Sequence, residues 1–241
     1  MNYGETLKVI ILAGGLGTRI SEETETKPKP MVEIAGAPIL WHIMKLYAMQ
    51  GFNEFVIATG YKSEVINDYV ETISDPWDVK TLDTGIDTQT GGRIKQCIEF
   101  INEPTVLCTY GDGLANVRVP DLIDIHRRSK KIATLTAVRP PARFGYVRIE
   151  SDLVTHFGEK NQADEGWING GFFVIDKKIT EYIKDNLEPF ETGALPRLSE
   201  NGDLGAYKHF GFWKPMDTLR EKIELETLAS TLNTPPWFGL P

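Results

Sequence analysis

Hydrophobic residues in the first half of the chain form short continuous runs that alternate with segments of helical spacing. Residues 7–13 (LKVIILA) are apolar, rich in β-branched side chains and followed by glycines, which predicts a strand buried on both faces of a parallel sheet. Residues 38–51 repeat apolar side chains at helical spacing between a proline and a glycine, which predicts a helix. Further strands are expected at 54–60 and 104–110, and further helices at 62–70 and 92–101. This alternation predicts an α/β fold with an open, mostly parallel sheet and helices on its faces.

The second half of the chain, from residue 126 onward, has shorter strands and predicts a mixed α+β unit that leans against the first half. Strands are expected at 131–140, 146–151, 153–159, 170–176, 205–210 and 211–215, and helices at 177–187 and 217–232. The closing helix is expected to bury an apolar stripe with one charged interruption, formed by Leu219, Ile223, Leu225, Glu226 and Leu228. With no visible linker, residues 1–241 are expected to form one domain with halves 1–125 and 126–241.

Composition and charge restrict the class of protein. The chain has 241 residues, 41% hydrophobic and 25% charged, with a net charge of −8, which favours neither disorder nor a membrane protein and argues against nucleic acid as a partner. Neither a signal-peptide pattern nor a membrane-length apolar run is found. Cys97 and Cys108 lack the spacing of a metal or disulfide framework and are expected to be buried free thiols. We therefore expect a soluble, cytoplasmic protein.

A glycine-rich turn follows the first strand and ends on a cation. Gly14, Gly15 and Gly17 precede Arg19, and such turns bring backbone N–H groups close to phosphate because no side chain intervenes. The spacing matches neither the dinucleotide fingerprint nor the P-loop. A tight connection between strand and helix explains the glycines equally well, but Arg19 favours phosphate, which a guanidinium binds bidentately.

One lysine and two aspartates are further candidates. Lys29 lies between Pro28 and Pro30, which keep the chain extended and not helical, so it could reach the same phosphates or be an ordinary solvated lysine. Asp112 follows a buried strand at the usual ligand edge of an α/β sheet, although a plain turn also explains it. Asp217 precedes the closing helix, and taken alone it is best explained as an N-cap.

Taken together, these segments resemble the sugar-phosphate nucleotidyltransferases. The motifs are LAGGLGTRI (12–20), KPKPM (27–31), DTGIDTQTGGRIK (83–95), TYGDG (109–113), INGGFFV (168–174) and GFWKPMDTLRE (211–221). They cover nearly the whole chain in family order and are most similar to the branch that joins CTP to glucose 1-phosphate and releases pyrophosphate. The resemblance implies a Rossmann-like sheet, a nucleotide-binding half at 1–125 and a sugar-phosphate-binding half at 126–241.

The resemblance also implies roles for individual residues. Catalytic cations are expected at Arg19 and Lys29, and Mg²⁺ ligands at Asp112 and Asp217. Nucleotide-binding positions are expected at Leu12, Ala13, Gly14, Gly15, Gly17, Thr18, Thr88, Gly92 and Arg93. Sugar-phosphate-binding positions are expected at Gly145, Glu159, Lys160 and Asn169. The implied reaction needs no general base, because the attacking phosphate is already ionised near neutral pH, its second pKa being about 6.

Some segments depart from the family pattern. Residues 71–75 replace a longer segment that takes part in subunit assembly in the family. A homo-oligomer is expected, but the number of subunits cannot be transferred from the family to this chain. Asn161 replaces a proline of the family, and residues 190–204 also differ from the family pattern. Both changes lie on the expected sugar side, so the identity of the sugar is the least secure part of the prediction. Two alternatives stay open: the same chemistry with another nucleotide or acceptor, and a noncatalytic subunit that senses nucleotides.

Overall fold

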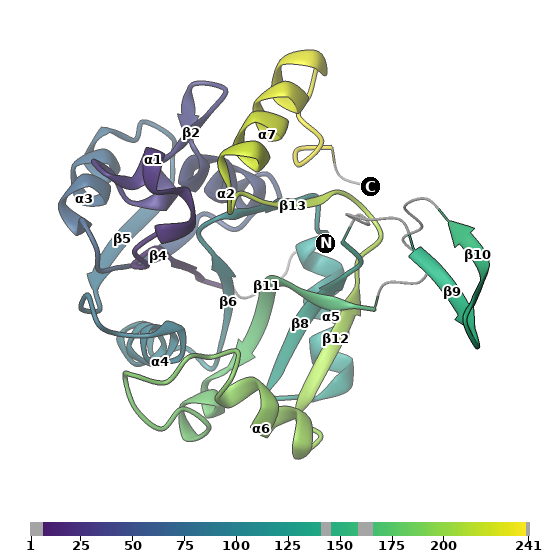
Figure 1. Ribbon diagram of the computed structural model, residues 1–241. Coiled ribbons are helices and arrows are strands. Elements are labelled where there is room, and N and C mark those ends of the chain that lie inside the picture. The colour runs from purple at the N-terminus through teal and green to yellow at the C-terminus, as the bar shows by residue number, and fades with distance from the viewer. Residues whose placement is uncertain (1–6, 141–145, 159–165, 240–241) are drawn as a thin grey trace.

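A seven-stranded sheet forms the centre of the protein (Figure 1). The computed structural model describes residues 7–140, 146–158 and 166–239, without the side chains of 146–149 and 156–158. The strand order is β12-β8-β11-β6-β1-β4-β5. The strands are β1 (Val9–Leu12), β4 (Glu54–Thr59), β5 (Asp78–Asp83), β6 (Thr105–Tyr110), β8 (Ala133–Val138), β11 (Ile168–Asp176) and β12 (Leu204–Lys208).

The strand directions confirm a mostly parallel sheet with one reversed strand. β1 pairs in parallel with β4 and β6, β4 with β5, and β8 with β12. β11 runs antiparallel to both of its neighbours, β6 and β8. The second half of the chain therefore extends the sheet of the first half through β11, instead of leaning against it as the sequence suggested.

Helices cover both faces of the sheet, as predicted. Along β1, Val9 and Ile11 join one apolar cluster while Ile10 and Leu12 join the other, because successive side chains of a strand point to opposite faces. The first cluster is covered by α2 (Ile39–Ala48), α3 (Ser63–Thr72), α5 (Val119–Ser129) and α7 (Leu219–Thr231). The second is covered by α4 (Thr90–Ile101), α6 (Ala194–Glu200) and the 3₁₀ helix η3 (Lys177–Glu181).

Short elements complete the described chain. A hairpin of β9 (Tyr146–Glu150) and β10 (Leu153–Gly158) extends away from the main sheet (Figure 1). The remaining short elements are η1 (Thr18–Ile20), α1 (Ser21–Thr24), η2 (Lys29–Met31), β2 (Glu33–Ile34), β3 (Ala37–Pro38), β7 (Gly113–Ala115) and β13 (Trp213–Pro215). Lys29 thus begins a single 3₁₀ turn, whereas the flanking prolines had predicted an extended segment.

The predicted helix at 177–187 is wrong beyond its first turn. Helical structure ends with η3 at Glu181. The carbonyls of Asn186 and Glu188 instead accept hydrogen bonds from the N–H groups of Gln89 and Gly91, at 2.8 and 3.1 Å. The segment therefore satisfies backbone donors at the start of α4, which would otherwise lack partners.

The predicted apolar stripe of the closing helix is also wrong in part. Leu225 is fully buried and Leu228 packs against the core, but Leu219 and Ile223 are 41% and 57% exposed. The buried face instead includes Glu221, whose carboxylate accepts backbone N–H groups before the helix. The inward side of α7 therefore combines a polar capping contact with apolar packing.

The C-terminal tail packs into the core through Trp237, which is fully buried. Its indole N–H lies 3.3 Å from Nδ1 of His42, while Nε2 of His42 lies 2.8 Å from the carbonyl of Ile34. An indole only donates and a carbonyl only accepts, so His42 is neutral with its proton on Nε2. Cys97 and Cys108 are buried free thiols, as predicted.

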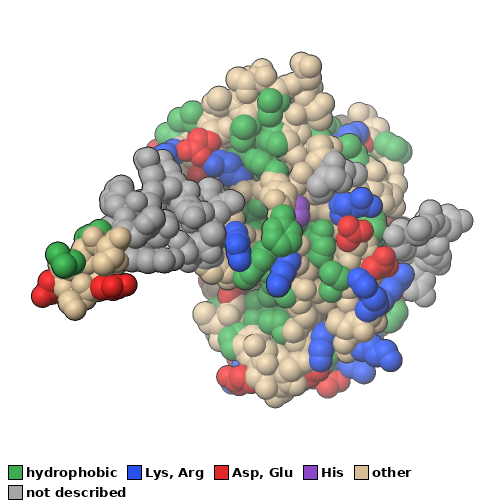
Figure 2. All heavy atoms as spheres, turned by 90° about the vertical axis from the view of Figure 1, so that its right-hand side faces the viewer, with side chains coloured by type: hydrophobic (Ala, Val, Ile, Leu, Met, Phe, Trp, Pro, Cys, Tyr) green, Lys and Arg blue, Asp and Glu red, His purple; other side chains and the backbone are tan. Residues whose placement is uncertain are grey.

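The face beside β12 carries an exposed aromatic and basic patch. Phe210 is 80% exposed and its ring lies 5.4 Å from that of Trp167. The charged groups of Arg139 and Lys208 lie 4.8 and 5.6 Å from the Trp167 ring. Figure 2, which views this side, shows lysine and arginine side chains beside hydrophobic ones. Contacts between cations and aromatic rings thus stabilise this surface.

No helix of the described residues is long and apolar enough to cross a membrane.

We expect the free energy of unfolding to fall as the pH is lowered below about 6.5. Burial lowers the pKa of His42, His126 and His209 from the ordinary value of 6.5, so the unfolded state binds protons first as the pH falls. Each histidine contributes a slope of at most about 1.4 kcal/mol per pH unit. Urea unfolding between pH 7.5 and 5.5 measures this slope, which His42→Gln should reduce. A flat profile would contradict the assignment.

Candidate active site

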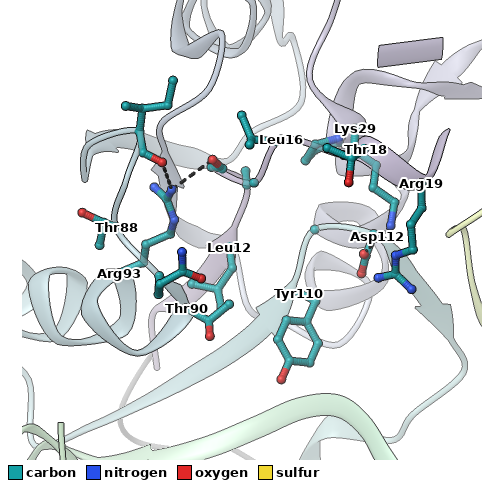
Figure 3. Close-up of a pocket in the computed structure, with 18 residues that line it drawn as sticks. Leu12, Leu16, Thr18, Arg19, Lys29, Thr88, Thr90, Arg93, Tyr110 and Asp112 are labelled. Carbon is teal, nitrogen blue, oxygen red and sulfur yellow. Dashed lines mark hydrogen bonds and ion pairs between the residues drawn. The ribbon is translucent and has the colours of Figure 1, made fainter. Parts of the chain in front are cut away.

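A cleft of about 390 Å³ opens at the carboxyl ends of β1 and β6 (Figure 3). Its lining includes eleven of the predicted site residues, namely Leu12, Ala13, Gly14, Gly15, Gly17, Thr18, Arg19, Lys29, Thr88, Arg93 and Asp112. Figure 3 shows Lys29, Arg19 and Asp112 at one end of the cleft, and Thr88 and Arg93 at the other. The cleft therefore brings together segments from both walls of the sheet's ligand edge.

The three glycines of the turn have different structural reasons. Gly17 has a φ of 66°, a left-handed conformation that glycine adopts at little cost. A Cβ on Gly14 would lie 2.1 Å from the guanidinium of Arg93, whereas a Cβ on Gly15 would meet nothing within 4 Å. Of these two glycines, only Gly15 therefore leaves open space for a ligand. The space beside Gly14 is filled by the side chain of Arg93.

Lys29 bridges the two aspartates. Its Nζ lies 2.6 Å from Oδ2 of Asp112 and 2.6 Å from Oδ1 of Asp217, and the residue is only 8% exposed. Burial alone lowers the pKa of Lys29, but the two carboxylates outweigh it and raise that pKa above the ordinary 10.5. The ammonium group is therefore charged throughout the physiological range.

Arg19 joins the same cluster from the glycine turn. Its Nη1 lies 2.9 Å from Oδ2 of Asp217, and its side chain is 71% exposed. Asp217 thus lies between two cations, and one of them faces solvent in the cleft. Arg19, Lys29, Asp112 and Asp217 form one cluster, although they come from four separate segments. We call this group the charged cluster.

Strand pairing and a helix cap position Asp217. β13 pairs antiparallel with β7, so that the N–H of Met216 donates to the carbonyl of Asp112 at 2.8 Å. The N-cap of α7 is Thr218, and not Asp217, which precedes it. Glu221 accepts the N–H groups of both residues at 2.8 and 3.0 Å in a capping box. The Asp217 carboxylate is therefore available to the charged cluster.

The donor set fits a divalent metal that arrives with a ligand. Asp112 and Asp217 direct one oxygen each to the same cation, the Lys29 ammonium. Among the residues whose side chains the structure describes, no group of three or more His, Cys, Asp or Glu side chains could hold a metal ion. Two carboxylates suit Mg²⁺, which takes its other ligands from water and substrate phosphates.

The predicted sugar side is described only in part. Gly145, Glu159 and Lys160 lie outside the described residues. Asn169 lies at the start of β11, before a register irregularity, and its Nδ2 lies 3.1 Å from the hydroxyl of Tyr110. That hydroxyl donates to Oε1 of Glu191 at 2.6 Å. Burial and Glu191 raise the pKa of Tyr110, which keeps the phenol protonated.

Sequence reasoning missed several residues of the cleft. They are Leu16, Pro30, Ile86, Gln89, Thr90, Tyr110 and Gly111. Tyr110 ends the buried strand two residues before Asp112, a position that could have been recognised as part of the ligand edge. Gly92 does not line the cleft, because it packs against residue 186, where a Cβ would lie 2.5 Å from the Cα of Asn186.

Comparisons with known proteins agree with this geometry. The sequence model of the nucleotidyl transferase family matches residues 8–218. The glucose-1-phosphate cytidylyltransferase of Salmonella typhi is 45% identical, over 92% of this chain and 95% of its own length. The D-glycero-alpha-D-manno-heptose 1-phosphate guanylyltransferase of Aneurinibacillus thermoaerophilus is 34% identical, over 73% of this chain and 77% of its own. The crystal structure of HddC from Yersinia pseudotuberculosis superimposes with a TM-score of 0.72 at 25% identity, covering 90% of this chain and 97% of that chain.

We expect Thr218→Ala to lower the free energy of unfolding by about 1 kcal/mol, because the substitution removes the side-chain cap of α7. Urea unfolding provides the measurement. Thr227→Ala is the matched control, since Thr227 lies on the same helix and is exposed, and its effect should stay within about 0.5 kcal/mol. Equal effects of the two substitutions would show that the cap contributes nothing specific.

Proposed function

The chain belongs to the nucleotidyl transferase family, and on this premise we propose that it converts CTP and α-D-glucose 1-phosphate to CDP-glucose and pyrophosphate. The observation that carries this proposal is the 45% identity with the Salmonella typhi enzyme over 92% of the chain. The charged cluster supports it, because polyanionic substrates require local cations in a protein of net charge −8.

The proposed reaction is an in-line displacement at phosphorus. An ionised oxygen of the sugar phosphate attacks the α-phosphorus of CTP, the new P–O bond forms, and the bond to pyrophosphate breaks. No side chain has to remove a proton, since the nucleophile is already ionised. The work of the protein is to position two polyanions and to stabilise the charge that they share.

In this proposal Arg19 and Lys29 supply the positive charge, and the glycine turn supplies backbone N–H groups. A unit charge at 4 Å contributes roughly 4 kcal/mol at an effective dielectric constant of 20, so two such cations would contribute substantially to stabilising the charge on the substrates. Asp112 and Asp217 would hold Mg²⁺, which offsets phosphate charge when bound. The same carboxylates hold Lys29 and Arg19 in place.

The two substrates are assigned to two different regions in and beside the cleft. We assign the nucleotide to the wall formed by residues 12–18 and by Thr88, which precedes α4. We assign the sugar phosphate to the side where Tyr110, Asn169 and Glu191 form a hydrogen-bonded chain. The resemblance of the sequence also implies sugar-phosphate roles for Gly145, Glu159 and Lys160, which lie outside the described residues. The nucleotide side thus comes from the half 1–125, and the sugar-phosphate side comes from the half 126–241 with Tyr110 added from the first half.

A second candidate keeps the chemistry and changes the substrates. The 34% identity with a heptose 1-phosphate guanylyltransferase shows that proteins of this similarity differ in both base and sugar. One assay separates the candidates. The protein is incubated with Mg²⁺, each common nucleoside triphosphate and a panel of sugar phosphates, and the mass of the product and the released pyrophosphate are measured. CDP-glucose supports the proposal, another conjugate supports the second candidate, and binding without turnover supports a nucleotide-sensing subunit.

We expect Lys29→Ala and Asp112→Asn each to reduce turnover at least about 10²-fold, the loss typical of one electrostatic stabiliser. Steady-state release of pyrophosphate is the measurement. Lys8→Ala is the control, because Lys8 pairs with Glu103 outside the cleft, and its rate should remain near that of the wild type. Near-normal rates for both cluster variants would remove the site assignment.

Location and assembly are also part of the proposal. We place the protein in the cytoplasm, which agrees with two buried free cysteines, and we expect it to form a homo-oligomer. Light scattering coupled to size-exclusion chromatography measures the number of copies.

A further inference from the structure

Arg93 is a buried cation in the wall of the cleft. It lies in the first turns of α4 and is only 4% exposed. Burial lowers the pKa of its guanidinium, and Asp83 partly opposes this shift. Among the described residues, no carboxylate lies within salt-bridge distance of Arg93. A buried charge without such a partner requires other groups to stabilise it.

Protein oxygens take up all four N–H groups of the two terminal nitrogens. Nη1 donates to the carbonyl of Thr59 at 2.8 Å and to the hydroxyl of Thr84. Nη2 donates to the carbonyls of Gly14 and Ile86 at 3.0 and 3.4 Å. An arginine has five N–H donors, so only the Nε–H remains. The guanidinium therefore has no terminal donor left for a phosphate.

These acceptors lie at the carboxyl ends of three neighbouring strands. Gly14 follows β1, Thr59 ends β4, and Thr84 follows β5. The hydroxyl of Thr84 also donates to the carbonyl of Thr59 at 2.7 Å, while the hydroxyl of Thr88 donates to the carbonyl of Thr84. One side chain thus connects the glycine turn with the opposite wall of the cleft, as the dashed lines of Figure 3 show.

Two glycines provide the space that the guanidinium occupies. A Cβ on Gly14 would lie 2.1 Å from Nη1 of Arg93, and a Cβ on Gly60 would lie 2.6 Å from the same atom. A Cβ on Gly15, the residue after Gly14, would meet nothing within 4 Å. The side chain of Arg93 therefore explains why residue 14 is a glycine. A ligand that approaches the turn closely would do so at Gly15.

We propose that Arg93 is a positioning residue, which fixes the glycine turn against the loop of residues 84–88 and so presets the separation of the two walls that hold the nucleotide. This inference rests on the proposed function for the identity of the nucleotide. It differs from direct binding, in which the guanidinium of Arg93 would contact phosphate. Lys29 and Arg19 then remain the cations that meet the triphosphate.

The first test compares Arg93→Lys with Arg93→Met. Lysine keeps the charge but cannot make four hydrogen bonds from two planar nitrogens. We expect both variants to weaken CTP binding about 10- to 100-fold, the scale of a small misplacement of binding groups, while the KM for glucose 1-phosphate changes less than about twofold. Calorimetry with CTP and steady-state kinetics measure these values. An Arg93→Lys variant with wild-type CTP affinity would overturn the proposal.

The second test is a double-mutant cycle with a matched control. Gly14→Ala should weaken CTP binding in the wild type, but add less than about twofold in the Arg93→Met background, because the clash is then absent. Gly15→Ala should weaken binding by the same factor in both backgrounds, because its space faces the ligand. Additive effects of Gly14→Ala would overturn the proposal.

Two further measurements keep the outcomes distinct. Thermal unfolding identifies any variant that fails to fold. Such a variant is replaced by Thr84→Val, which removes one acceptor of Arg93 together with the hydroxyl that donates to the carbonyl of Thr59, and which should weaken CTP binding in the same direction. Wild-type formation of CDP-glucose is measured first. If the wild type uses another nucleotide, the proposed function fails, and the same cycle is run with that nucleotide to judge Arg93.

Discussion

A single ammonium group holds the charged cluster together. Asp112 and Asp217 would repel each other without a cation between them, and the Nζ of Lys29 lies 2.6 Å from one oxygen of each. The surrounding structure serves this contact: the 3₁₀ turn η2 presents the lysine, and the pairing of β7 with β13 brings the two acids side by side. The capping box leaves the Asp217 carboxylate unused by α7. Under the proposed function, binding of a metal and a triphosphate would therefore exchange partners within an existing set of charges.

The parts of the fold that the sequence predicted are those with strong local patterns. Continuous apolar runs located β1, β4 and β6, because both faces of these strands are buried. Strand β5 was missed because it lies at the sheet edge, with exposed charges between half-buried residues. Helix α5 was missed although Pro120 marks its first turn. The segment after η3 was misjudged because its backbone serves α4, a contact between residues far apart in the sequence.

The same distinction holds for the candidate site. Most of the expected residues line one cleft, because most of their motifs follow a strand of the sheet, while Lys29 reaches the cleft from the 3₁₀ turn η2. The chain of Tyr110, Asn169 and Glu191 joins three separate segments, and no local pattern could indicate it. The glycine turn gave a partly misleading signal. All three glycines had suggested close approach of phosphate, but the space at Gly14 is filled by a side chain from α4.

The reversed strand β11 has a consequence for the order of events during translation. β6 pairs with β1 on one side and with β11 on the other, so its second edge stays unpaired on a nascent chain until residues 168–176 leave the ribosome. Exposed strand edges invite pairing with other chains. Asp217 emerges later still, and only then does Lys29 gain its second carboxylate partner. The edge of β6 therefore stays open to pairing with other chains until β11 has been made, and the cleft is completed only after residue 217.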